Sequence, residues 1–183
     1  SISANAFSAF GSVSARIEFD KTDGKKIFVN DMPLSKTGDL LGNINAVMFN
    51  PQQLKLVQES PEDRRRFMDI ALSQMSRKYF YALLKYRKIL QQRNGLLKEK
   101  DVELIKDTLP VWDEQLCLVA TDIICARNEF LTDLKPFSKQ AHFDITDGRE
   151  KLEISSEQKF EGGAVEVKEQ LKAKLSEVLD KDI

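Results

Sequence analysis

The alternation of apolar and polar side chains near the start of the chain predicts a β-hairpin. Between Val13 and Asp20 every second residue is apolar, which is the period of a strand with one buried face. Asp23-Gly24 follows as a turn sequence, and the apolar run 27–29 supplies a second strand. Asn30-Asp31 predicts a further turn. A short buried strand is predicted for 46–49, because an Asn-Pro pair then ends the apolar run.

The middle of the chain changes to a spacing of three and four residues, which predicts helices. Ser60-Pro61 is a helix-start sequence, since serine caps a helix and proline fits its first position. Ser76 offers a second cap. The helix after it has an apolar stripe of Tyr79, Leu83, Tyr86, Leu90 and Leu97. A second stripe, predicted for a helix after Pro110, consists of Trp112, Leu116, Val119, Ile123, Phe130 and Leu134. Each helix should have about 24 residues, and a charged segment from Lys98 to Thr108 should join them as an antiparallel pair.

The last third of the chain has weaker patterns. Leu152 and Ile154 alternate with polar residues, which predicts a strand. Gly162-Gly163 breaks the chain, and 165–179 has the pattern of a charged amphipathic helix.

These patterns predict an α+β fold with a small antiparallel sheet and a mainly helical lobe built on two long antiparallel helices. We divide the chain into a sheet portion at 1–58 and a helical lobe at 59–140. The third part, 141–183, holds short strands and a charged helix that returns toward the sheet.

Composition limits the class of protein. With 183 residues and 42% hydrophobic content, the chain can form one medium domain or two small lobes. No apolar run approaches the roughly 18 residues that a membrane span needs, and the N-terminus lacks the basic and apolar regions of a secretory signal. Cys117 and Cys125 are too far apart on one helix for a disulfide, so we expect buried thiols and a cytoplasmic protein. Because the first residue is Ser1 and not Met, we expect a longer parent sequence.

Charge is unevenly distributed along the chain. Residues 61–100 contain 11 basic and 4 acidic residues, a net charge of +7, whereas 101–183 contain 11 basic and 19 acidic residues, a net charge of −8. A basic stripe on the first segment could neutralise phosphates. The alternative is that the basic helices pair with the acidic region as ordinary surface charges.

The sequence contains none of the common nucleotide-binding or catalytic motifs. A P-loop needs G-x-x-x-x-G-K-[ST], but Gly38 and Gly42 are one residue too close and no lysine follows them. The single histidine, His142, has no supporting triad spacing, and there is no CxxC pair for a metal. We therefore expect no catalytic residue, no metal site and no cofactor in this chain by itself.

Three motifs in the middle of the chain resemble the RecF family of bacterial recombination proteins. The run at 46–54 is similar to the family's V-x-F-x-P-x-x-L segment, and the run at 60–69 is similar to its S-P-x-x-R-R-x-F-[LI]-D motif, with Met68 as a mild departure. The order Y-x(6)-Y-x(3)-L-x-Q-R-N between Tyr79 and Asn94 is specific, and few chance matches to it are expected. The resemblance is strong in the middle and looser toward both ends.

The resemblance implies an SMC-like, ABC-type ATPase head, in which a parent protein binds ATP and magnesium at a dimer interface. Such a parent is expected to be a weak ATPase that binds double-stranded or gapped DNA during recombinational repair and the SOS response. RecR- and RecO-type mediators and a second copy of the parent are its implied partners. The family's P-loop would precede Ser1, and its signature and Walker B acid would follow Ile183.

The resemblance also points to particular residues. Gln52 lies where ABC-type heads place a residue that senses the γ-phosphate and the metal; the alternative is a solvated turn residue. The paired arginines of the second motif fall in the run Arg64 to Arg66, where Arg65 and Arg66 would contact DNA phosphate or a dimer partner. Their alternative is an ion pair with Asp69. The remaining candidates for DNA or dimer contact are Lys78, Arg87, Arg93 and Lys98, of which Arg93 could instead pack inside the helical lobe.

Two functions therefore remain open. The first is ATP-dependent DNA binding by the parent protein, and the second is a helical protein-docking module that never touches DNA. The two differ in salt dependence, because binding to phosphates weakens steeply with salt and apolar docking does not.

Overall fold

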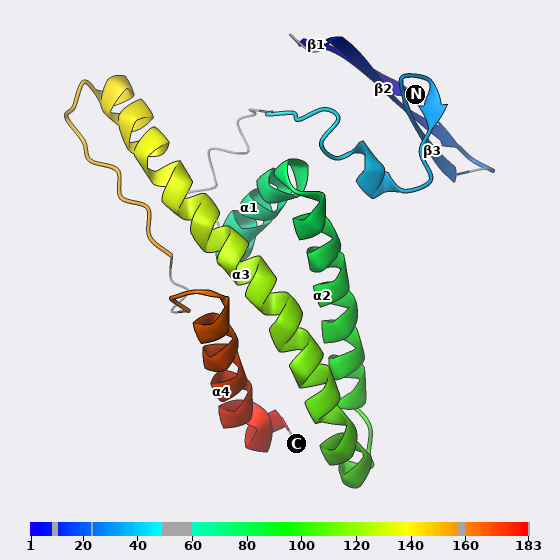
Figure 1. The fold of residues 1–183 in the computed structure, drawn as a ribbon, viewed down its shortest axis with the longest axis vertical. Coiled ribbons are helices and arrows are strands. Elements are labelled where there is room, and N and C mark those ends of the chain that lie inside the picture. The colour runs from blue at the N-terminus through cyan, green and yellow to red at the C-terminus, as the bar shows by residue number, and fades with distance from the viewer. Residues whose placement is uncertain (9–10, 23, 49–59, 157–159, 183) are drawn as a thin grey trace. The chain divides into compact units, whose positions relative to one another are not determined.

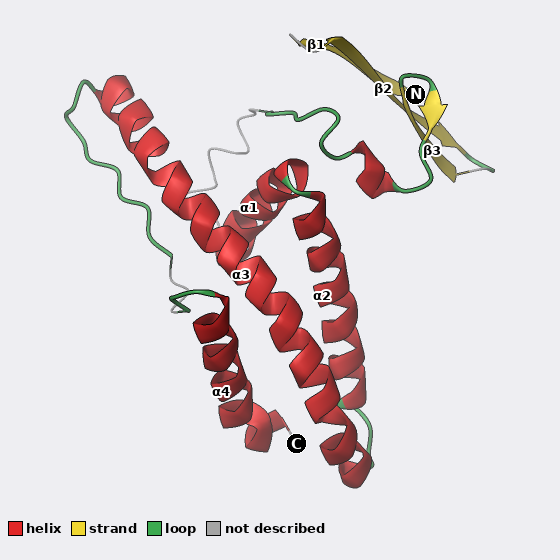
Figure 2. Cartoon of the chain, in the orientation of Figure 1, coloured by secondary structure: helices red, strands yellow, loops and turns green. Residues whose placement is uncertain are grey.

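The computed structural model describes residues 1–8, 11–22, 24–48, 60–156 and 160–182 (Figure 1). The chain folds as two compact units, Ser1–Tyr81 and Ala82–Ile183. The first unit holds a sheet and a helical corner, and the second holds a group of long helices (Figure 2). The predicted α+β fold is confirmed.

The sheet of the first unit is an antiparallel meander. Strands β1 (Ile2–Ser8), β2 (Gly11–Asp20), β3 (Gly24–Val29) and β4 (Met32–Pro33) follow one another in the order of the sequence. Ile17 pairs with Ile2 on one side and with Ile27 on the other, so these apolar residues share one face. The predicted hairpin is confirmed, and β1 is a strand that the sequence patterns did not predict.

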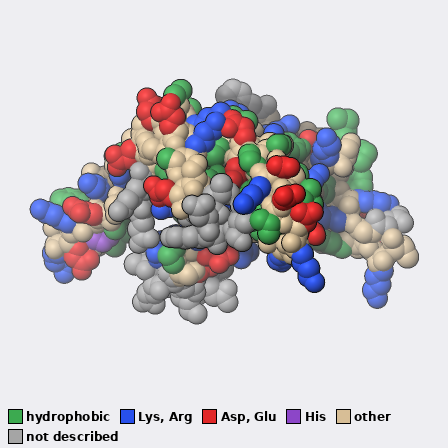
Figure 3. Space-filling model, turned by 90° about the horizontal axis from the view of Figure 1, so that it is seen from below, with side chains coloured by type: hydrophobic (Ala, Val, Ile, Leu, Met, Phe, Trp, Pro, Cys, Tyr) green, Lys and Arg blue, Asp and Glu red, His purple; other side chains and the backbone are tan. Residues whose placement is uncertain are grey.

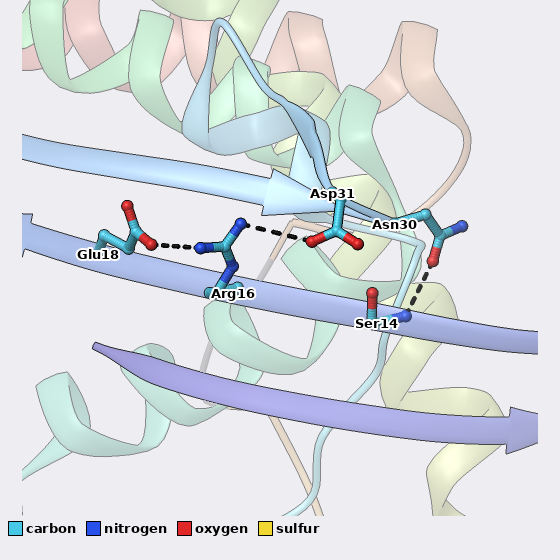
Figure 4. Close-up of polar contacts among 5 residues, drawn as sticks. All are labelled: Ser14, Arg16, Glu18, Asn30 and Asp31. Atoms are coloured by element: carbon cyan, nitrogen blue, oxygen red, sulfur yellow. Dashed lines mark hydrogen bonds and ion pairs between the residues drawn. The ribbon is translucent and has the colours of Figure 1, made fainter.

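The turn at Asn30 and Asp31 joins β3 to β4. Both residues have positive φ angles, 51° and 62°, as a two-residue type I′ turn requires. The Asn30 side-chain Oδ1 accepts a hydrogen bond from the Ser14 backbone N–H at 2.9 Å. Arg16 pairs with Glu18 and, at 3.4 Å, with Asp31 (Figure 4). The Arg16 guanidinium also lies 4.4 Å from the centre of the Phe28 ring. The predicted turn therefore forms, held by the backbone N–H of Ser14 and the side chain of Arg16, both in β2.

A helical corner completes the first unit. Helix α1 (Pro61–Met75) begins at the predicted cap, where the Ser60 hydroxyl accepts from the Asp63 backbone N–H and donates to the Asp63 carboxylate. Helix α2 (Arg77–Leu96) follows, and the Ser76 hydroxyl accepts from the backbone N–H of Tyr79. Both predicted caps are confirmed.

A short 3-10 helix, η1 (Thr37–Leu40), is held against this corner by side chains of the helices. Arg77 donates from Nε to the Leu41 carbonyl at 2.7 Å and from Nη2 to the Asp39 carbonyl at 3.1 Å. The Gln74 side chain accepts from the Ala46 backbone N–H at 2.7 Å. Arg77 is thus used for structure in the first unit.

Two predicted strands are wrong. Residues 46–48 form no strand, and Val47 is fully exposed, because the Ala46 N–H bonds to a side chain and not to a neighbouring strand. Phe49, the last residue of that prediction, lies outside the described residues. Leu152 and Ile154 also lie in irregular chain, so alternation alone was insufficient there.

The second unit is organised by α3 (Val102–Thr146), which has 45 residues. It runs antiparallel to α2, as predicted (Figure 1). The predicted start after Pro110 and the predicted linker to Thr108 are wrong, because the helix begins at Val102 and continues through Pro110 and Pro136. The Asp101 side chain caps it, and Ile105 and Leu109 are almost fully buried before the proline. We attribute the longer helix to this cap and burial, which offset the roughly 3 kcal/mol that an interior proline costs.

Helix α4 (Ala164–Asp182) packs on α3, and Val167 is completely buried. Lys168 and Lys172 both pair with Glu114 of α3, at 2.9 and 2.5 Å. Farther along α3, the Asn128 side-chain amide donates to the Phe160 carbonyl at 3.1 Å. The predicted C-terminal helix is confirmed, and three side chains attach its region to α3.

Two glycines should respond to alanine in opposite ways. A Cβ at Gly38 would lie 2.6 Å from the Tyr81 hydroxyl oxygen, whereas a Cβ at Gly95 would meet nothing within 4 Å. Gly38→Ala should lower the free energy of unfolding by about 1–3 kcal/mol through overpacking. Gly95→Ala should raise it by up to about 1 kcal/mol, because alanine favours a helix. Urea unfolding followed by circular dichroism measures both, and equal effects of the same sign would contradict the packing of η1 on α2.

The attachment of α4 should depend on pH through Glu114. Lys172, and after it Lys168, hold the pKa of Glu114 below its ordinary value of 4.5. The carboxylate therefore stabilises the docked helix above that value, and its contribution is lost as pH falls through the lowered pKa. The protection factors of the α4 amides, which are exchange rates corrected for the intrinsic pH dependence of exchange, should fall in that range. Glu114→Gln should lower these protection factors already at neutral pH and remove their dependence on pH, while Glu177→Gln, whose partner Lys174 lies within α4, should not.

Candidate nucleic-acid interface

The first turns of α1 present the arginines that the sequence selects. Arg64 is half-buried and has a partner in the structure, while Arg65 and Arg66 are exposed. Neither Arg65 nor Arg66 forms an ion pair or side-chain hydrogen bond with any described residue. Asp69, the alternative partner, accepts a hydrogen bond from the Tyr79 hydroxyl. Among the residues that the structure describes, the guanidinium groups of Arg65 and Arg66 therefore have no bound partner.

The same helix also exposes apolar side chains. Phe67, Ile70 and Met75 are 44%, 54% and 69% exposed. Phosphate contacts need cations and polar donors, whereas aromatic and aliphatic side chains beside arginine are typical of protein interfaces. The surface of α1 therefore has the chemistry for either ligand.

The candidates on α2 differ in accessibility. Lys78 and Arg87 are exposed on the helix, and Lys98 is exposed just after its end. Lys78 also has an interaction within the structure, and Lys78 and Arg87 belong to different compact units. Basic and acidic side chains are interspersed on the face seen in the space-filling view (Figure 3). The described surface there is mixed in charge.

Arg93 occupies a different environment from the other candidates. It is 6% exposed, and its Nε donates to Asp113 of α3 at 2.6 Å. A buried cation must be paired, and this pair lies between the two long helices. Arg93 therefore holds the helical hairpin together, which is the structural alternative that the sequence left open for it.

The remaining expectations concern nucleotide, metal and membrane. Gln52, the candidate for nucleotide contact, lies outside the described residues. Within the described ranges no cluster of three or more His, Cys, Asp or Glu side chains could hold a metal ion. In the same ranges no helix combines the length and apolar character needed to cross a membrane.

Solved structures share this fold. The recombination mediator protein RecF-ATPrS in the RecFOR pathway is 32% identical, with a TM-score of 0.83 over 98% of this chain and 48% of that chain. RecF-ATP in the same pathway is 31% identical, with a TM-score of 0.81 over 94% of this chain and 47% of that chain. No protein-family model matches the chain.

Curated sequences agree with the solved structures. The DNA replication and repair protein RecF of Acetivibrio thermocellus is 44% identical over 142 residues, which are 76% of this chain and 38% of the relative. RecF of Halothermothrix orenii is 47% identical over 135 residues, 73% of this chain and 36% of the relative. The chain thus spans little more than a third of the length of the curated relatives it matches.

These likenesses define the class first: the chain is related to the DNA replication and repair proteins that act as recombination mediators. Within that class, the chain belongs to the RecF family. The resemblance found in the motifs at 46–54, 60–69 and 79–94 is confirmed.

The buried pair gives a test that separates structure from ligand contact. Arg93→Met should lower the free energy of unfolding by about 3 kcal/mol, because it leaves the Asp113 carboxylate uncompensated. Arg87→Met, on the exposed face of α2, should change it by less than about 0.5 kcal/mol. Urea unfolding measures both values. Equal effects of the two substitutions would mean that Arg93 does not stabilise the hairpin. Combining Arg93→Met with Asp113→Leu should restore most of the lost free energy of unfolding, because no carboxylate is then left unpaired.

Proposed function

We propose that this chain is the part of a RecF-type recombination mediator that contacts DNA through the exposed arginines of α1. The observation that carries the proposal is the exposure of Arg65 and Arg66 without an ion-pair partner among the described residues. Burying an arginine without a partner costs free energy. A solvated arginine at a helix surface avoids that cost and can form bidentate hydrogen bonds to phosphate. The net charge of +7 in 61–100 supports the same proposal.

The proposal extends to the parent protein. Such a parent would bind ATP with magnesium at a homodimer interface, hydrolyse ATP weakly, and bind DNA at gaps in repair and the SOS response. The names RecF-ATPrS and RecF-ATP of the two solved relatives support a nucleotide-binding parent, and their RecFOR pathway supports RecR- and RecO-type partners. This chain contains no P-loop sequence, so the nucleotide chemistry would reside elsewhere in the parent, with Gln52 as this chain's candidate contact.

We further propose which part of the parent protein each segment of the chain forms. Residues 1–58 would belong to the sheet of the ATPase head, 59–140 would form the helical lobe, and 141–183 would return toward the head. A cytoplasmic location fits a protein of this class.

A second function has its own support. The exposed Phe67, Ile70 and Met75 add apolar surface to the helix that carries the arginines. That composition favours docking to a protein partner or to a second copy without DNA contact. Arginine is enriched in such interfaces as well, so salt dependence has to decide between the two.

The experiment is a titration of fluorescently labelled double-stranded DNA with this chain, followed by anisotropy at low and moderate salt. Arg65→Ala combined with Arg66→Ala should weaken binding and reduce the slope of log affinity against log salt by about 2, or nearly one for each lost phosphate contact. Lys21→Ala combined with Lys25→Ala removes two exposed cations from the β2–β3 hairpin and should leave the slope almost unchanged.

Absence of DNA binding at low salt would overturn the assignment of α1 to DNA. An equal loss of DNA affinity in both double variants would show that the affinity depends on net charge and not on Arg65 and Arg66 in particular. Binding of a partner protein that survives moderate salt and is lost on Phe67→Ala would instead establish the docking function.

A further inference from the structure

The hydroxyl groups of Ser60 and Tyr79 bind the two half-buried carboxylates of α1. Ser60 donates to Asp63 at the start of the helix, and Tyr79, in the first turn of α2, donates to Asp69. Tyr79 is only 4% exposed, and a buried tyrosine ring holds its hydroxyl in one place. All four residues belong to the first compact unit. A residue of the neighbouring helix therefore holds a carboxylate of α1.

Asp69 stands within reach of the exposed arginines of α1. It follows Arg65 by four residues and Arg66 by three, which are the spacings of neighbouring side chains on a helix. Helical side chains lean toward the N-terminus of their helix, so the Asp69 side chain leans toward the turn that carries the arginines. Neither arginine forms an ion pair with it or with any other described residue. The carboxylate accepts the hydrogen bond of Tyr79 instead.

Glu62 provides a comparison on the same helix. It precedes Arg65 by three residues and Arg66 by four, so it has the same two spacings on the other side of the arginines. Glu62 is exposed, and no described residue forms an ion pair or side-chain hydrogen bond with its carboxylate. Glu62 and Asp69 therefore share their distance from the arginines, but only Asp69 is held by a buried hydroxyl.

We propose that Tyr79 is a positioning residue for DNA contact, because its hydroxyl keeps the Asp69 carboxylate from pairing with Arg65 or Arg66. The inference rests on the proposed contact between these arginines and DNA phosphate. A carboxylate that pairs with an arginine occupies the N–H donors that a phosphate needs, so the two acceptors compete. A carboxylate released beside the arginines would also repel the phosphates of the DNA backbone.

The first test removes the hydroxyl and measures the affinity for labelled double-stranded DNA by anisotropy. Tyr79→Phe keeps the buried ring and should weaken binding at low salt by about two- to threefold, because a helical ion pair would then occupy one arginine for more than half of the time. The deficit should shrink at moderate salt, which screens that ion pair. Tyr81→Phe is the matched control, since no described residue bonds to the hydroxyl of Tyr81, and it should not change the affinity.

The second test is a double-mutant cycle with the two acids. Asp69→Asn should raise DNA affinity by about two- to threefold more in the Tyr79→Phe variant than in the unmodified chain, because only the variant has a released carboxylate to remove. Glu62→Gln removes the same charge from α1, and it should raise the affinity by the same factor in both backgrounds. This difference between the two acids is not expected from a general loss of packing.

A measurement without DNA separates this inference from the proposed function. Heteronuclear NMR follows the exchange of the Nε–H protons of Arg65 and Arg66 with water, which a hydrogen bond to a carboxylate slows. Tyr79→Phe should slow this exchange by about twofold or more at one of the two arginines, and adding Asp69→Asn should reverse the change. Circular dichroism checks that Tyr79→Phe keeps its helices. Asp69→Asn alone leaves the buried ring untouched and should not change the exchange.

Each result supports or overturns the inference. Unchanged exchange after Tyr79→Phe, or faster exchange after Asp69→Asn alone, overturns it, because the hydroxyl then does not control the carboxylate. A loss of DNA affinity that Asp69→Asn does not reverse, or that Tyr81→Phe also causes, overturns it as well, since altered packing then accounts for the loss. Slowed exchange in a chain that binds no DNA retains the control of Asp69 by Tyr79 and overturns the proposed DNA contact instead.

Discussion

Two adjacent acidic residues of α3 attach both neighbouring helices, and the second unit depends on them. Asp113 receives Arg93 of α2, and Glu114 receives Lys168 and Lys172 of α4. Consecutive helical residues point about 100° apart, so one turn of α3 can hold a helix on each of two sides. The two contacts differ in strength, because the pair with Arg93 is buried and the pairs with Glu114 are exposed to solvent. The Arg93–Asp113 pair is therefore the buried attachment of α3, and the pairs of Glu114 with α4 are the more solvent-exposed ones.

This arrangement divides the basic residues of 61–100 into two groups. Arg77 and Arg93 hold parts of the fold together, through backbone carbonyls in the first unit and through a buried carboxylate in the second. Arg65 and Arg66 have no such contact with a described residue. A net charge of +7 therefore overstates the cations that are available to DNA. Residues of the second group, and the exposed Arg87, keep guanidinium donors that no described residue occupies.

Family membership and the exposed side chains of α1 both support DNA contact, but they are separate observations. The likeness to RecF relatives covers most of this chain but little more than a third of theirs. It identifies the fold and the class, while the exposed arginines of α1 belong to this chain's own surface. A function of the assembled parent protein depends on the family fold as well as on this chain's exposed side chains. Segments of the parent that this chain does not contain can complete a site.

The sequence by itself determined the elements whose signal is local. The alternation from Val13 to Asp20, the turn at Asn30-Asp31 and the caps at Ser60 and Ser76 all form as predicted, because neighbouring residues satisfy them. The motifs at 46–54, 60–69 and 79–94, read together, also indicated the family. Tertiary structure decided what depends on distant partners. Strand β1 forms through pairing with β2, and α3 continues through Pro110. Arg93 became structural only through Asp113, which lies twenty residues away. Periodicity shows which face of an element is apolar, but only the packed fold shows what covers that face.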